Sequence, residues 1–546
     1  MSVAEAVEGI RNLLREDQSS TTRPDRISYS GDMWPRMQLW KKMGVIDRSP
    51  PDCVVWPENG DEVAAVLKEA NRHKCPVIPY GAGSGVCGGT YPVKGGVVID
   101  VRRMDKVVRI DEESFLLEAE AGILGHHLEQ ALGEKGFTLG HFPSSILCST
   151  LGGWVATRSA GQYSSFYGKI EDMVVGLEVV LPNGEVLRTG LFGNNYGGDW
   201  TQIFVGSEGT LGIITRVLLR IHPAPTRKEF RGFSFDRLSR ATGAMRELMQ
   251  SDVRPSVLRL YDPLDTLVAS AGKREKKSGS LGKRMAFLLR SSPSIETPGP
   301  VSGDWMRKVS DRIAAGPSPF MDGLQRQALH TALSQPLVLN KVIDVFSSRC
   351  LLIVGVEGQG QSVSDKMSRI RERFTEMGGE DLGEEPGLRW FRNRYAVSFK
   401  QSRFYAMGAF VDTIEVACPW SRLLELYDEV KRTIGQRALV MAHFSHAYAE
   451  GCSIYFTFAA YRPSPSESER LYMRIWHEAL ATVVRCGGTI SHHHGIGLMK
   501  RDFMVREHGD GARLFRALKA QFDPNGIMNP GKLFPDVSLD SAGGEA

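Results

Sequence analysis

A glycine-rich loop between two short apolar runs constrains this fold more than any other stretch of the sequence. Glycine occupies positions 81, 83, 85, 88 and 89, between the apolar runs 77–79 and 97–101. Such a loop reaches positive φ, and its free N–H groups form a concave anion site that suits a pyrophosphate. A strand rather than a helix follows, and no Gly-Lys-Ser/Thr is present, which excludes a Rossmann turn and a Walker loop. Taken alone, the loop also fits a surface turn.

Two further segments are rich in small residues. The first runs from Gly140 to Gly161 and has Gly152-Gly153 at an expected helix start, and the second is Gly-Ser-Glu-Gly-Thr-Leu-Gly-Ile-Ile at 206–214. A helix start with little side-chain bulk lets a ligand approach the main chain. Three such loops exceed chance glycine use, so we expect them to enclose one ligand.

The length and composition exclude several classes of protein. A chain of 546 residues holds two or more domains, and a net charge of +4 argues against a general nucleic-acid binder. Eight cysteines are scattered without a Cys-x-x-Cys pair, which favours a reducing compartment over a disulfide or zinc scaffold. There is no secretory signal pattern and no apolar run long enough to span a bilayer, so we expect a cytoplasmic protein.

The hydrophobic pattern changes character near residue 225. Before it, short strands alternate with helices, with a helix capped by Asp61 and running through His73, and a hairpin at Pro182-Asn183-Gly184. After it, the pattern predicts an antiparallel sheet with helices on one side. A helix is expected over 498–520. The strands of that sheet are expected at 351–356, 410–417, 438–443 and 452–459, and its helices at 361–377, 420–434 and 467–486.

The three loops together resemble the FAD-binding domain of the vanillyl-alcohol-oxidase/PCMH superfamily, over residues 50 to 225. The resemblance implies a PCMH-type domain in an α+β protein and FAD held non-covalently, because the surroundings of Cys87 and Cys148 do not look like attachment motifs. It also implies a set of cofactor-binding residues. These are Tyr80, Gly81, Ala82, Gly83, Ser84, Gly85 and Val86; Pro143, Ser144, Ser145, Ile146, Leu147, Cys148, Ser149, Thr150, Gly152, Gly153, Thr157, Arg158 and Gly161; and Glu208, Gly209, Thr210, Leu211, Gly212, Ile213 and Ile214.

The second half resembles the alkyldihydroxyacetonephosphate synthase family. The resemblance is carried by Ser-His-His-His-Gly-Ile-Gly at 491–497, by Cys-Ser-Ile-Tyr-Phe-Thr-Phe at 452–458 and by Arg-Pro-Ser-Val-Leu-Arg-Leu-Tyr-Asp at 254–262. It implies catalytic roles for Tyr455 as acid/base, for Arg259 beside the flavin, and for His492, His493 and His494. Without the resemblance, a strand tyrosine is usually a core residue. The pattern disfavours metal ligation by the histidines alone, because adjacent side chains point apart whereas metal ligands must converge.

One position departs from the family pattern. Where the family has an arginine that holds the substrate phosphate, gapless counting places Gln401. Lys400 or Arg403 is the expected substitute, and Arg394 is a more distant candidate. Lysine lacks the bidentate fork of arginine, so the departure bears on the substrate more than on the flavin.

The resemblance implies an exchange in ether-lipid synthesis. Acyl-dihydroxyacetone phosphate loses its fatty acid and gains a fatty alcohol through a flavin N5 adduct, without net redox change. The alternative is an FAD-linked oxidase or dehydrogenase of a 2-hydroxy acid such as D-lactate or glycolate. Those relatives carry His-Ala-Gly-Asp-Gly and Glu-His-Gly-Ile-Gly motifs, whereas here Tyr448 follows His446-Ala447 and His493 replaces the glutamate.

These patterns predict four parts and a short set of partners. The parts are an N-terminal helical or irregular segment (1–50), the FAD-binding domain (51–225), a substrate or cap domain (226–490) and a C-terminal segment that completes the active site (491–546). The expected partner is a lipid-like small molecule, with no nucleic acid; homodimers are common in the family. A basic and apolar segment at 273–289 fits a solvated loop or peripheral contact with an anionic membrane.

Overall fold

The chain divides into two compact units. The computed structural model describes residues 2–45, 48–192, 199–270, most of 327–340, 349–396 and 401–535. The first unit comprises Met1–Gly161, Gly168–Ala224 and Ile490–Ala546, and the second comprises Gln162–Tyr167 and Pro225–Thr489. Along the sequence, the second unit is therefore an insertion in the first. None of the described helices is both long and apolar enough to cross a bilayer.

The first unit begins with a small, mostly parallel sheet. Its strands are short valine-rich runs, ordered β1-β2-β4-β3, and β1 pairs antiparallel at the edge. Helices α1 (Val3–Leu13) and α4 (Gly60–Arg72) bury Ile10 and Leu67 in the same core as these strands. The strand bounds are β1 Ser19–Ser20, β2 Cys53–Val55, β3 Val77–Tyr80 and β4 Val97–Asp100.

The start of α4 corrects one prediction. Asn59, not Asp61, is the N-cap residue, and its side chain accepts a hydrogen bond from Glu62 N–H at 2.9 Å. Asp61 lies in the first turn, where a carboxylate faces the positive end of the helix dipole. Both residues are typical of a helix start, so the sequence pattern predicts the helix but does not distinguish which residue caps it.

A second sheet of the first unit is antiparallel throughout. Its order is β5-β6-β10-β8-β9, and the predicted hairpin at Pro182-Asn183-Gly184 joins β8 to β9, with Gly184 at φ +79°. The strand bounds are β5 Val107–Asp111, β6 Leu116–Glu120, β8 Val174–Val180, β9 Val186–Arg188 and β10 Ile213–Arg220. A further two-stranded sheet pairs β7 (Phe137–Thr138) with β11 (His222–Pro223).

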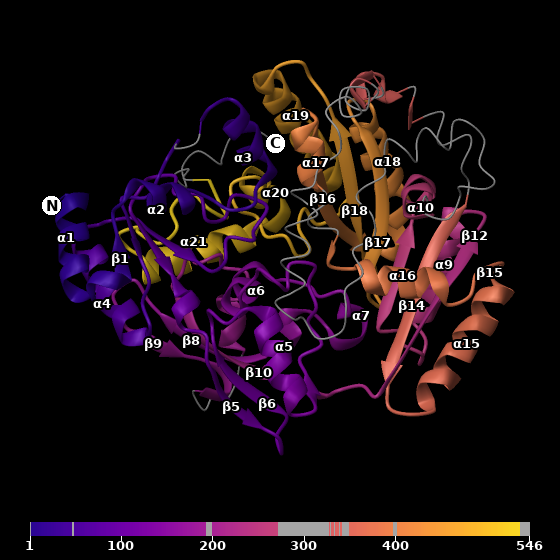
Figure 1. Ribbon diagram of the computed structural model, residues 1–546, viewed down its shortest axis with the longest axis horizontal. Helices are drawn as coiled ribbons and strands as arrows, with labels where there is room; N and C mark the ends of the chain where they lie inside the picture. The colour runs from indigo at the N-terminus through magenta and orange to yellow at the C-terminus, as the bar shows by residue number, and fades with distance from the viewer. Residues whose placement is uncertain are drawn as a thin grey trace, which may run out of the picture. The chain divides into compact units, whose positions relative to one another are not determined.

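The C-terminal segment packs within this first unit (Figure 1). The single helix expected over 498–520 is instead two helices, α20 (Met504–His508) and α21 (Asp510–Phe522), because Gly509 at φ +50° interrupts them. The chain then runs beside β3, where Val77 N–H donates to the Ile527 carbonyl at 2.8 Å. Residues 527–529 thus lie along the edge of the sheet that bears the glycine-rich loop.

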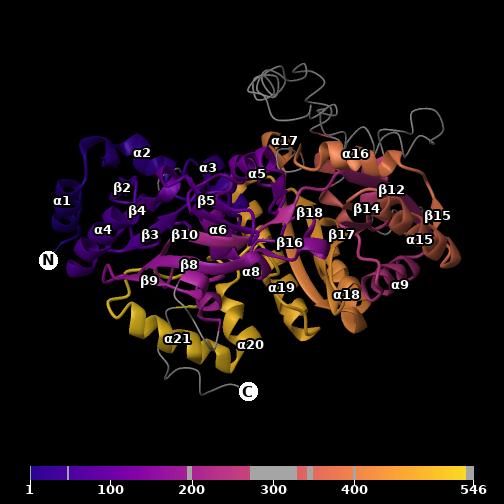
Figure 2. The ribbon, with the colours of Figure 1, turned by 90° about the horizontal axis from the view of Figure 1, so that it is seen from below.

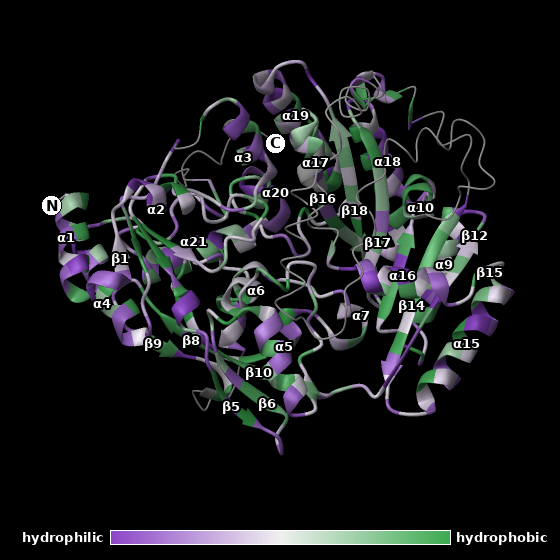
Figure 3. Cartoon of the chain, viewed as in Figure 1, coloured by the Kyte–Doolittle hydropathy of each residue, from purple (hydrophilic) through white to green (hydrophobic). Residues whose placement is uncertain are grey.

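The second unit is built on one seven-stranded antiparallel sheet, which confirms the predicted sheet type. The strand order is β15-β12-β14-β13-β17-β18-β16. Figure 3 shows its central strands as mostly hydrophobic, whereas helices such as α15 (Ser362–Glu376) alternate in character. The strand bounds are β12 Arg227–Phe235, β13 Val257–Tyr261, β14 Cys350–Gly358, β15 Glu380–Asp381, β16 Phe410–Pro419, β17 Leu439–Ala447 and β18 Gly451–Ala460.

Helices cover both faces of this sheet, so the expectation of one covered side was wrong. Phe233 contacts Phe374 of α15, with ring centroids 5.1 Å apart. Phe230, three residues earlier on β12, stacks on Phe391 of α16 (Glu385–Asn393) at 4.8 Å. Side chains an odd number of residues apart point to opposite faces of a strand. Figure 2 shows α15 and α16 on either side of β12 and β14.

The remaining helices complete the two units. Those of the first unit are α2 (Arg23–Ser28), α3 (Pro35–Lys42), α5 (Gly125–Glu134), α6 (Leu151–Thr157) and α8 (Ile170–Met173). Those of the second are α7 (Ser164–Tyr167), α9 (Leu238–Met249), α10 (Pro263–Ser270), α17 (Gln401–Ala406), α18 (Leu423–Gly435) and α19 (Pro465–Arg485).

Candidate active site

The glycine-rich loop leaves β3 at Tyr80 and returns as β4, and the two strands are parallel neighbours. Gly83 has φ +63°, and a Cβ there would lie 2.0 Å from the Tyr80 hydroxyl oxygen. A Cβ at Gly81 would lie 2.3 Å from Thr150 Oγ1. Only glycine fits these places, so the loop keeps its backbone exposed and lies directly against the second predicted loop.

A part of the N-terminal segment supports this loop, which the sequence did not predict. Met33 N–H donates to the carbonyls of Gly83 and Gly85 at 3.1 and 2.9 Å. Burial raises the pKa of the Asp32 carboxyl to about 7, although backbone N–H groups of Trp34, Thr90 and Gly89 lower it. The residues around position 32 show no periodicity and lie about fifty positions upstream, so no local signal linked them to the loop.

The second loop ends in a short helix whose start is as predicted. Thr150 caps α6 and its Oγ1 accepts a hydrogen bond from Gly153 N–H at 3.3 Å. Gly152 N–H donates to the Ala121 carbonyl at 2.7 Å, and a Cβ at Gly152 would lie 2.8 Å from the Ala121 Cβ. The helix ends at Arg158 in the left-handed conformation. The small residues therefore serve close packing of the helix start against the second sheet.

Glu208 joins the third loop to the C-terminal histidine segment. Its carboxylate accepts hydrogen bonds from Ile496 N–H and, at 2.9 Å, from Gly497 N–H. Burial raises the pKa of Glu208, while these two N–H groups lower it. Asn529 Nδ2 donates both to the Glu208 carbonyl at 2.7 Å and to the Gly89 carbonyl at 3.0 Å. One carboxylate and one amide thus tie three predicted segments together inside the first unit.

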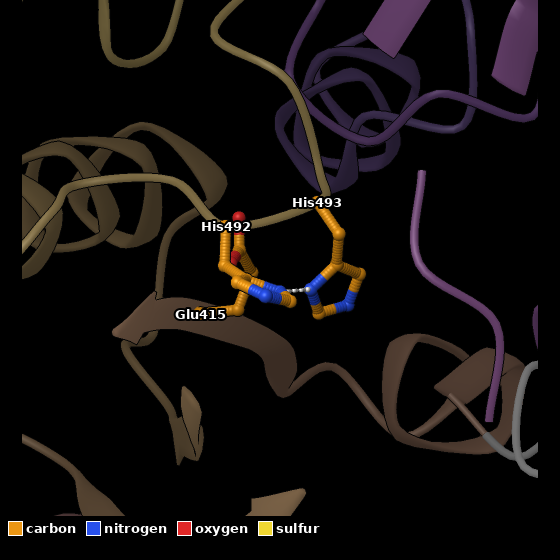
Figure 4. Close-up of side chains that lie close together, drawn as sticks. All are labelled: Glu415, His492 and His493. Carbon is orange, nitrogen blue, oxygen red and sulfur yellow. Dashed lines mark hydrogen bonds between the residues drawn. The ribbon is translucent and has the colours of Figure 1, made fainter. Parts of the chain in front are cut away.

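His492, His493 and His494 lie just before the two N–H groups, at 496 and 497, that bind Glu208. Figure 4 shows the rings of His492 and His493 turned toward each other, with their Nδ1 atoms 3.1 Å apart. The rings of His493 and His494 meet edge to face at 4.6 Å. Lys169 Nζ donates to the His492 carbonyl at 2.8 Å. Since one nitrogen of the His492–His493 pair must donate and the other accept, the pair can hold or pass one proton.

The residues of the first unit fit FAD. The backbone of the glycine-rich loop and the start of α6 suit the pyrophosphate. Thr90 Oγ1 and Asn529 Oδ1 are buried beside the loop and have no hydrogen-bond partner among the described residues. A bound ligand would supply partners for these two oxygen atoms. Cys87 is only 3% exposed, while Cys148 is exposed.

In the second unit, the predicted acid/base lies in a row of polar side chains across four strands. Tyr261 pairs with His443, His443 with Tyr455, and Tyr455 with Glu415. Directly opposite residues of an antiparallel ladder present their side chains on the same face. Arg259, two residues before Tyr261, shares that face. The register therefore assembles the two site residues predicted from the motifs, Tyr455 and Arg259, with three that were not predicted, Tyr261, His443 and Glu415.

The surroundings of Tyr455 hold its phenol in the neutral form. Burial raises the pKa of Tyr455 to about 12; a hydrogen bond with Thr413 and the charge of Arg259 oppose this shift, and Asp412 and Glu415 add to it. Glu415 is fully buried, while Tyr455 itself is half-buried. At neutral pH the phenol is a proton donor that needs a cation to become a base.

His443 lies between a carboxylate and a guanidinium. Its Nδ1 contacts Asp265 Oδ2 of α10 at 3.2 Å, and its Nε2 lies 2.7 Å from Arg259 Nη2. Its ring stacks on Tyr455 with centroids 4.7 Å apart. Burial and the charge of Arg259 lower the pKa of His443 well below its usual range. Neither His443 nor Asp265 belongs to a motif, so only the strand register reveals them.

Of the three candidate phosphate ligands, Lys400, Arg403 and Arg394, only Arg394 has a described side chain. Lys400 lies outside the described residues, as does the basic and apolar segment 273–289. Arg403 lies in α17, but its side chain is outside the described part of the chain. Arg394 donates through NH1 to the Phe391 carbonyl at 2.6 Å, and its guanidinium carbon lies 3.9 Å from the centre of the Phe391 ring.

The residue that begins the hydroxy-acid-type motif is engaged elsewhere. His446 adopts φ +51° at a bulge of β17, and its Nδ1 lies 2.8 Å from Ser164 Oγ. The Tyr448 hydroxyl donates to the same serine oxygen at 3.2 Å. Tyr448 thus takes part in a serine–histidine hydrogen-bond chain where the other motif has glycine.

Comparison with known proteins gives matches along most of the chain. The FAD binding domain family matches residues 51–190, and the C-terminal domain of FAD linked oxidases matches residues 306–533. An alkyldihydroxyacetonephosphate synthase of Dictyostelium discoideum is 30% identical over 98% of this chain and 82% of the relative. The glycolate oxidase subunit GlcD of Bacillus subtilis is 27% identical over 93% of this chain and 92% of the relative. A solved alkyldihydroxyacetonephosphate synthase has a TM-score of 0.72 at 27% identity, over 97% of this chain and 86% of that one.

Proposed function

The chain is an FAD-binding, alkyldihydroxyacetonephosphate-synthase-like member of the PCMH-type superfamily, and from this premise we propose that it exchanges the acyl group of acyl-dihydroxyacetone phosphate for a fatty alcohol. The observation that carries the proposal is the environment of Tyr455. A phenol that is stacked on His443, and whose ionised form is favoured by the charge of Arg259, suits a residue that moves a substrate proton. The 30% identity to a synthase, over nearly the whole chain, supports the substrate class.

The exchange balances without an external oxidant. The C–O bond between the three-carbon unit and its acyl group breaks, and the fatty acid leaves as a carboxylate. A new C–O bond forms to the fatty alcohol, whose hydroxyl proton is released. When bound, FAD supplies an electrophilic ring that reversibly accepts an electron pair.

The residues of the chain divide the remaining work. As a phenolate stabilised by Arg259, Tyr455 takes the proton of the carbon that bears the acyl group, and the phenol so formed returns it later. The segments at 80–86, 143–161 and 206–214 hold the cofactor. The histidines at 492–494 provide phosphate-binding and proton-passing groups. A basic residue near position 400 binds the substrate phosphate.

The second candidate is an FAD-linked oxidoreductase of a 2-hydroxy acid. The 27% identity to a glycolate oxidase subunit favours it. Against it stand the loss of the His-Ala-Gly-Asp-Gly motif and the engagement of His446 by Ser164. A cytoplasmic location, peripheral membrane contact and a homodimer remain predictions of both readings.

One experiment separates the two candidates. The purified FAD-loaded protein is incubated without oxygen either with acyl-dihydroxyacetone phosphate and radiolabelled hexadecanol or with D-lactate and glycolate, while the flavin spectrum is recorded. We expect label in an alkali-stable ether product and no lasting flavin reduction by the hydroxy acids. Lasting two-electron reduction by a hydroxy acid, with no labelled ether, would overturn the proposal in favour of the oxidoreductase.

A further inference from the structure

We propose that His443, held by Asp265, is a positioning residue that fixes the guanidinium of Arg259 and the ring of Tyr455 for the reaction. This inference rests on the proposed function for the identity of the reaction, but not for the geometry. All four residues belong to the second unit. They come from α10, β13, β17 and β18, so no single element can place them without the others.

The hydrogen bonds fix the state of the imidazole. Arginine has only donors, so His443 Nε2 must accept a hydrogen bond from Arg259 at 2.7 Å. The proton of the neutral ring then lies on Nδ1, which donates to Asp265 Oδ2 at 3.2 Å. The resulting order, carboxylate to imidazole to guanidinium, uses both ring nitrogens. A protonated His443 would have no lone pair for Arg259, so the arrangement requires a neutral ring.

The α10 helix presents Asp265 to this ring. The Asp262 side chain accepts a hydrogen bond from Asp265 N–H at 2.8 Å, which fixes the first turn of the helix. Asp262 in turn accepts from the Tyr427 hydroxyl at 3.0 Å. Asp265 is 7% exposed, so its carboxylate is held in a sheltered place. The imidazole is thus oriented by a group that is itself oriented.

Arg259 has a second donor, its Nε–H, next to the Nη2 group that binds His443. Its Nε is buried and has no hydrogen-bond partner among the described residues. Leaving a charged N–H group buried without an acceptor is costly, so such a group marks the place of an electron-rich ligand atom. With one NH2 group committed to His443, the direction of the Nε–H is set by the imidazole. We assign this Nε–H to an oxygen of the substrate.

The stacked ring gives His443 a second role. Its face lies against the Tyr455 ring at 4.7 Å with 22° between the planes. The stacking limits rotation of the phenol about its Cβ bond, and the hydrogen bonds limit rotation of the imidazole. A misplacement of about 1 Å can cost about 100-fold in rate, so both restraints act on turnover rather than on binding.

Matched substitutions test the kinetic part. His443→Phe keeps a flat ring beside Tyr455 but removes both hydrogen bonds, whereas His443→Gln retains one donor and one acceptor. We expect His443→Phe to lower kcat by roughly 10- to 100-fold with KM changed less than about threefold. His443→Gln is expected to recover most of this loss. His330→Phe is the control, because His330 also stacks on a tyrosine, Tyr461, at 3.6 Å, but its Nε2 contacts the Met407 carbonyl.

A spectroscopic readout tests the geometry without turnover. Protein labelled with ¹⁵N-histidine is recorded by NMR from pH 6 to 9, and the His443 signal is assigned from its absence in His443→Gln. We expect a neutral ring with its proton on Nδ1 that does not titrate in this range. A proton on Nε2, a titrating ring, or equal kcat in His443→Phe and wild type would overturn the proposal.

The two outcomes remain distinguishable from failure of the proposed function. If the protein reduces its flavin with a hydroxy acid and makes no ether, the same variants are assayed by the rate of that reduction. The expected ratios between His443→Phe, His443→Gln and wild type stay the same. The positioning role then survives while the exchange reaction is abandoned.

Discussion

The phenol of Tyr455 is neutral because of where the strand register puts it, between a stacked imidazole and a buried carboxylate. Glu415 and Asp412 oppose its ionisation, and Arg259 favours it. This balance makes the residue a proton donor at rest that becomes a base only while the guanidinium is in place. In the first unit, burial likewise raises the pKa of the Asp32 carboxyl, which lies beside a loop suited to phosphate.

Replacement of Tyr455 by phenylalanine tests the proton transfer. Tyr455→Phe should retain its FAD and lose exchange activity by about 100-fold or more, because a positioned acid/base contributes about 10²–10⁴ in rate. Flavin absorbance per chain and label incorporation measure the two properties. The control Tyr461→Phe removes a hydroxyl just after β18, the strand that carries Tyr455, and should keep both the bound FAD and the exchange activity. Full activity in Tyr455→Phe would remove this residue from the mechanism.

Ionisation of Asp32 is expected to weaken FAD binding. The carboxyl is neutral below its pKa of about 7 and charged above it, so repulsion of the pyrophosphate appears as the pH rises. The Kd for FAD should increase on the order of tenfold between pH 6 and 8.5, from roughly 1–2 kcal/mol of repulsion. Asp32→Asn should abolish this increase, as measured by quenching of flavin fluorescence on titration of apoprotein. An unchanged pH dependence in Asp32→Asn would place the titrating group elsewhere.

At the level of elements, the cofactor site of the first unit consists of loops that are held together by hydrogen bonds with the C-terminal segment. Glu208 accepts from the C-terminal segment, and Asn529 donates to the first and third loops. Gly497 is where the backbone of the C-terminal segment comes closest to the first loop: a Cβ there would lie 2.2 Å from the Cys87 carbonyl oxygen. The contact leaves no room for a side chain.

A pair of glycine substitutions separates this close approach from backbone strain. Gly497 has φ +52° and Gly526 has φ +64°, but nothing lies within 4 Å of a Cβ at Gly526. Gly526→Ala should therefore cost only the conformational strain of roughly 1 kcal/mol, whereas Gly497→Ala should cost more and lower the bound FAD. Thermal unfolding and flavin content of both variants check this. Equal losses in the two variants would show that the contact with Cys87 is unimportant.

Elements that arise from local patterns could be predicted, and relations between distant elements could not. The glycine-rich loop, the helix start at Gly152 and the antiparallel sheet of the second unit each follow from short-range signals. The break at Gly509 was missed because an isolated glycine is tolerated within a helical pattern. The second face of the sheet was missed because the amphipathic pattern of α16 does not say which face it covers. His443 meets Asp265, about 180 positions earlier, because β17 pairs with β13 and α10 follows β13, and one sequence does not reveal that pairing.

At the level of the whole molecule, acid sensitivity is expected from His141, which is fully buried in the first unit. Burial lowers the pKa of His141 to about 3, below its usual 6.5, and its Nε2 lies 3.2 Å from Ser159 Oγ. Below pH 6.5 the unfolded chain therefore binds a proton that the folded chain does not. Stability is present above pH 6.5 and is lost, by up to about 1.4 kcal/mol per pH unit, as the pH falls toward 3.

The change in thermal stability with pH tests this expectation. In His141→Asn the contribution is absent, so its unfolding temperature should fall less than that of wild type between pH 6.5 and 4.5. The comparison concerns the slope, so any constant loss from the substitution cancels. His508→Asn, which changes an exposed residue, should follow the wild-type slope. Parallel curves for His141→Asn and wild type would contradict the assigned cause.

The order of the chain also sets an order of synthesis. The first unit is left incomplete at Ala224 and is resumed only at Ile490, and the segment that pairs with the edge of β3 comes still later, at residues 527–529. A ribosome must therefore translate the entire inserted unit before the nascent protein can finish its nucleotide cradle. Until then the edge of β3 is unpaired. Premature termination of translation after Pro225 therefore yields a chain that has the three cofactor-binding loops but lacks the C-terminal residues that hydrogen-bond to them.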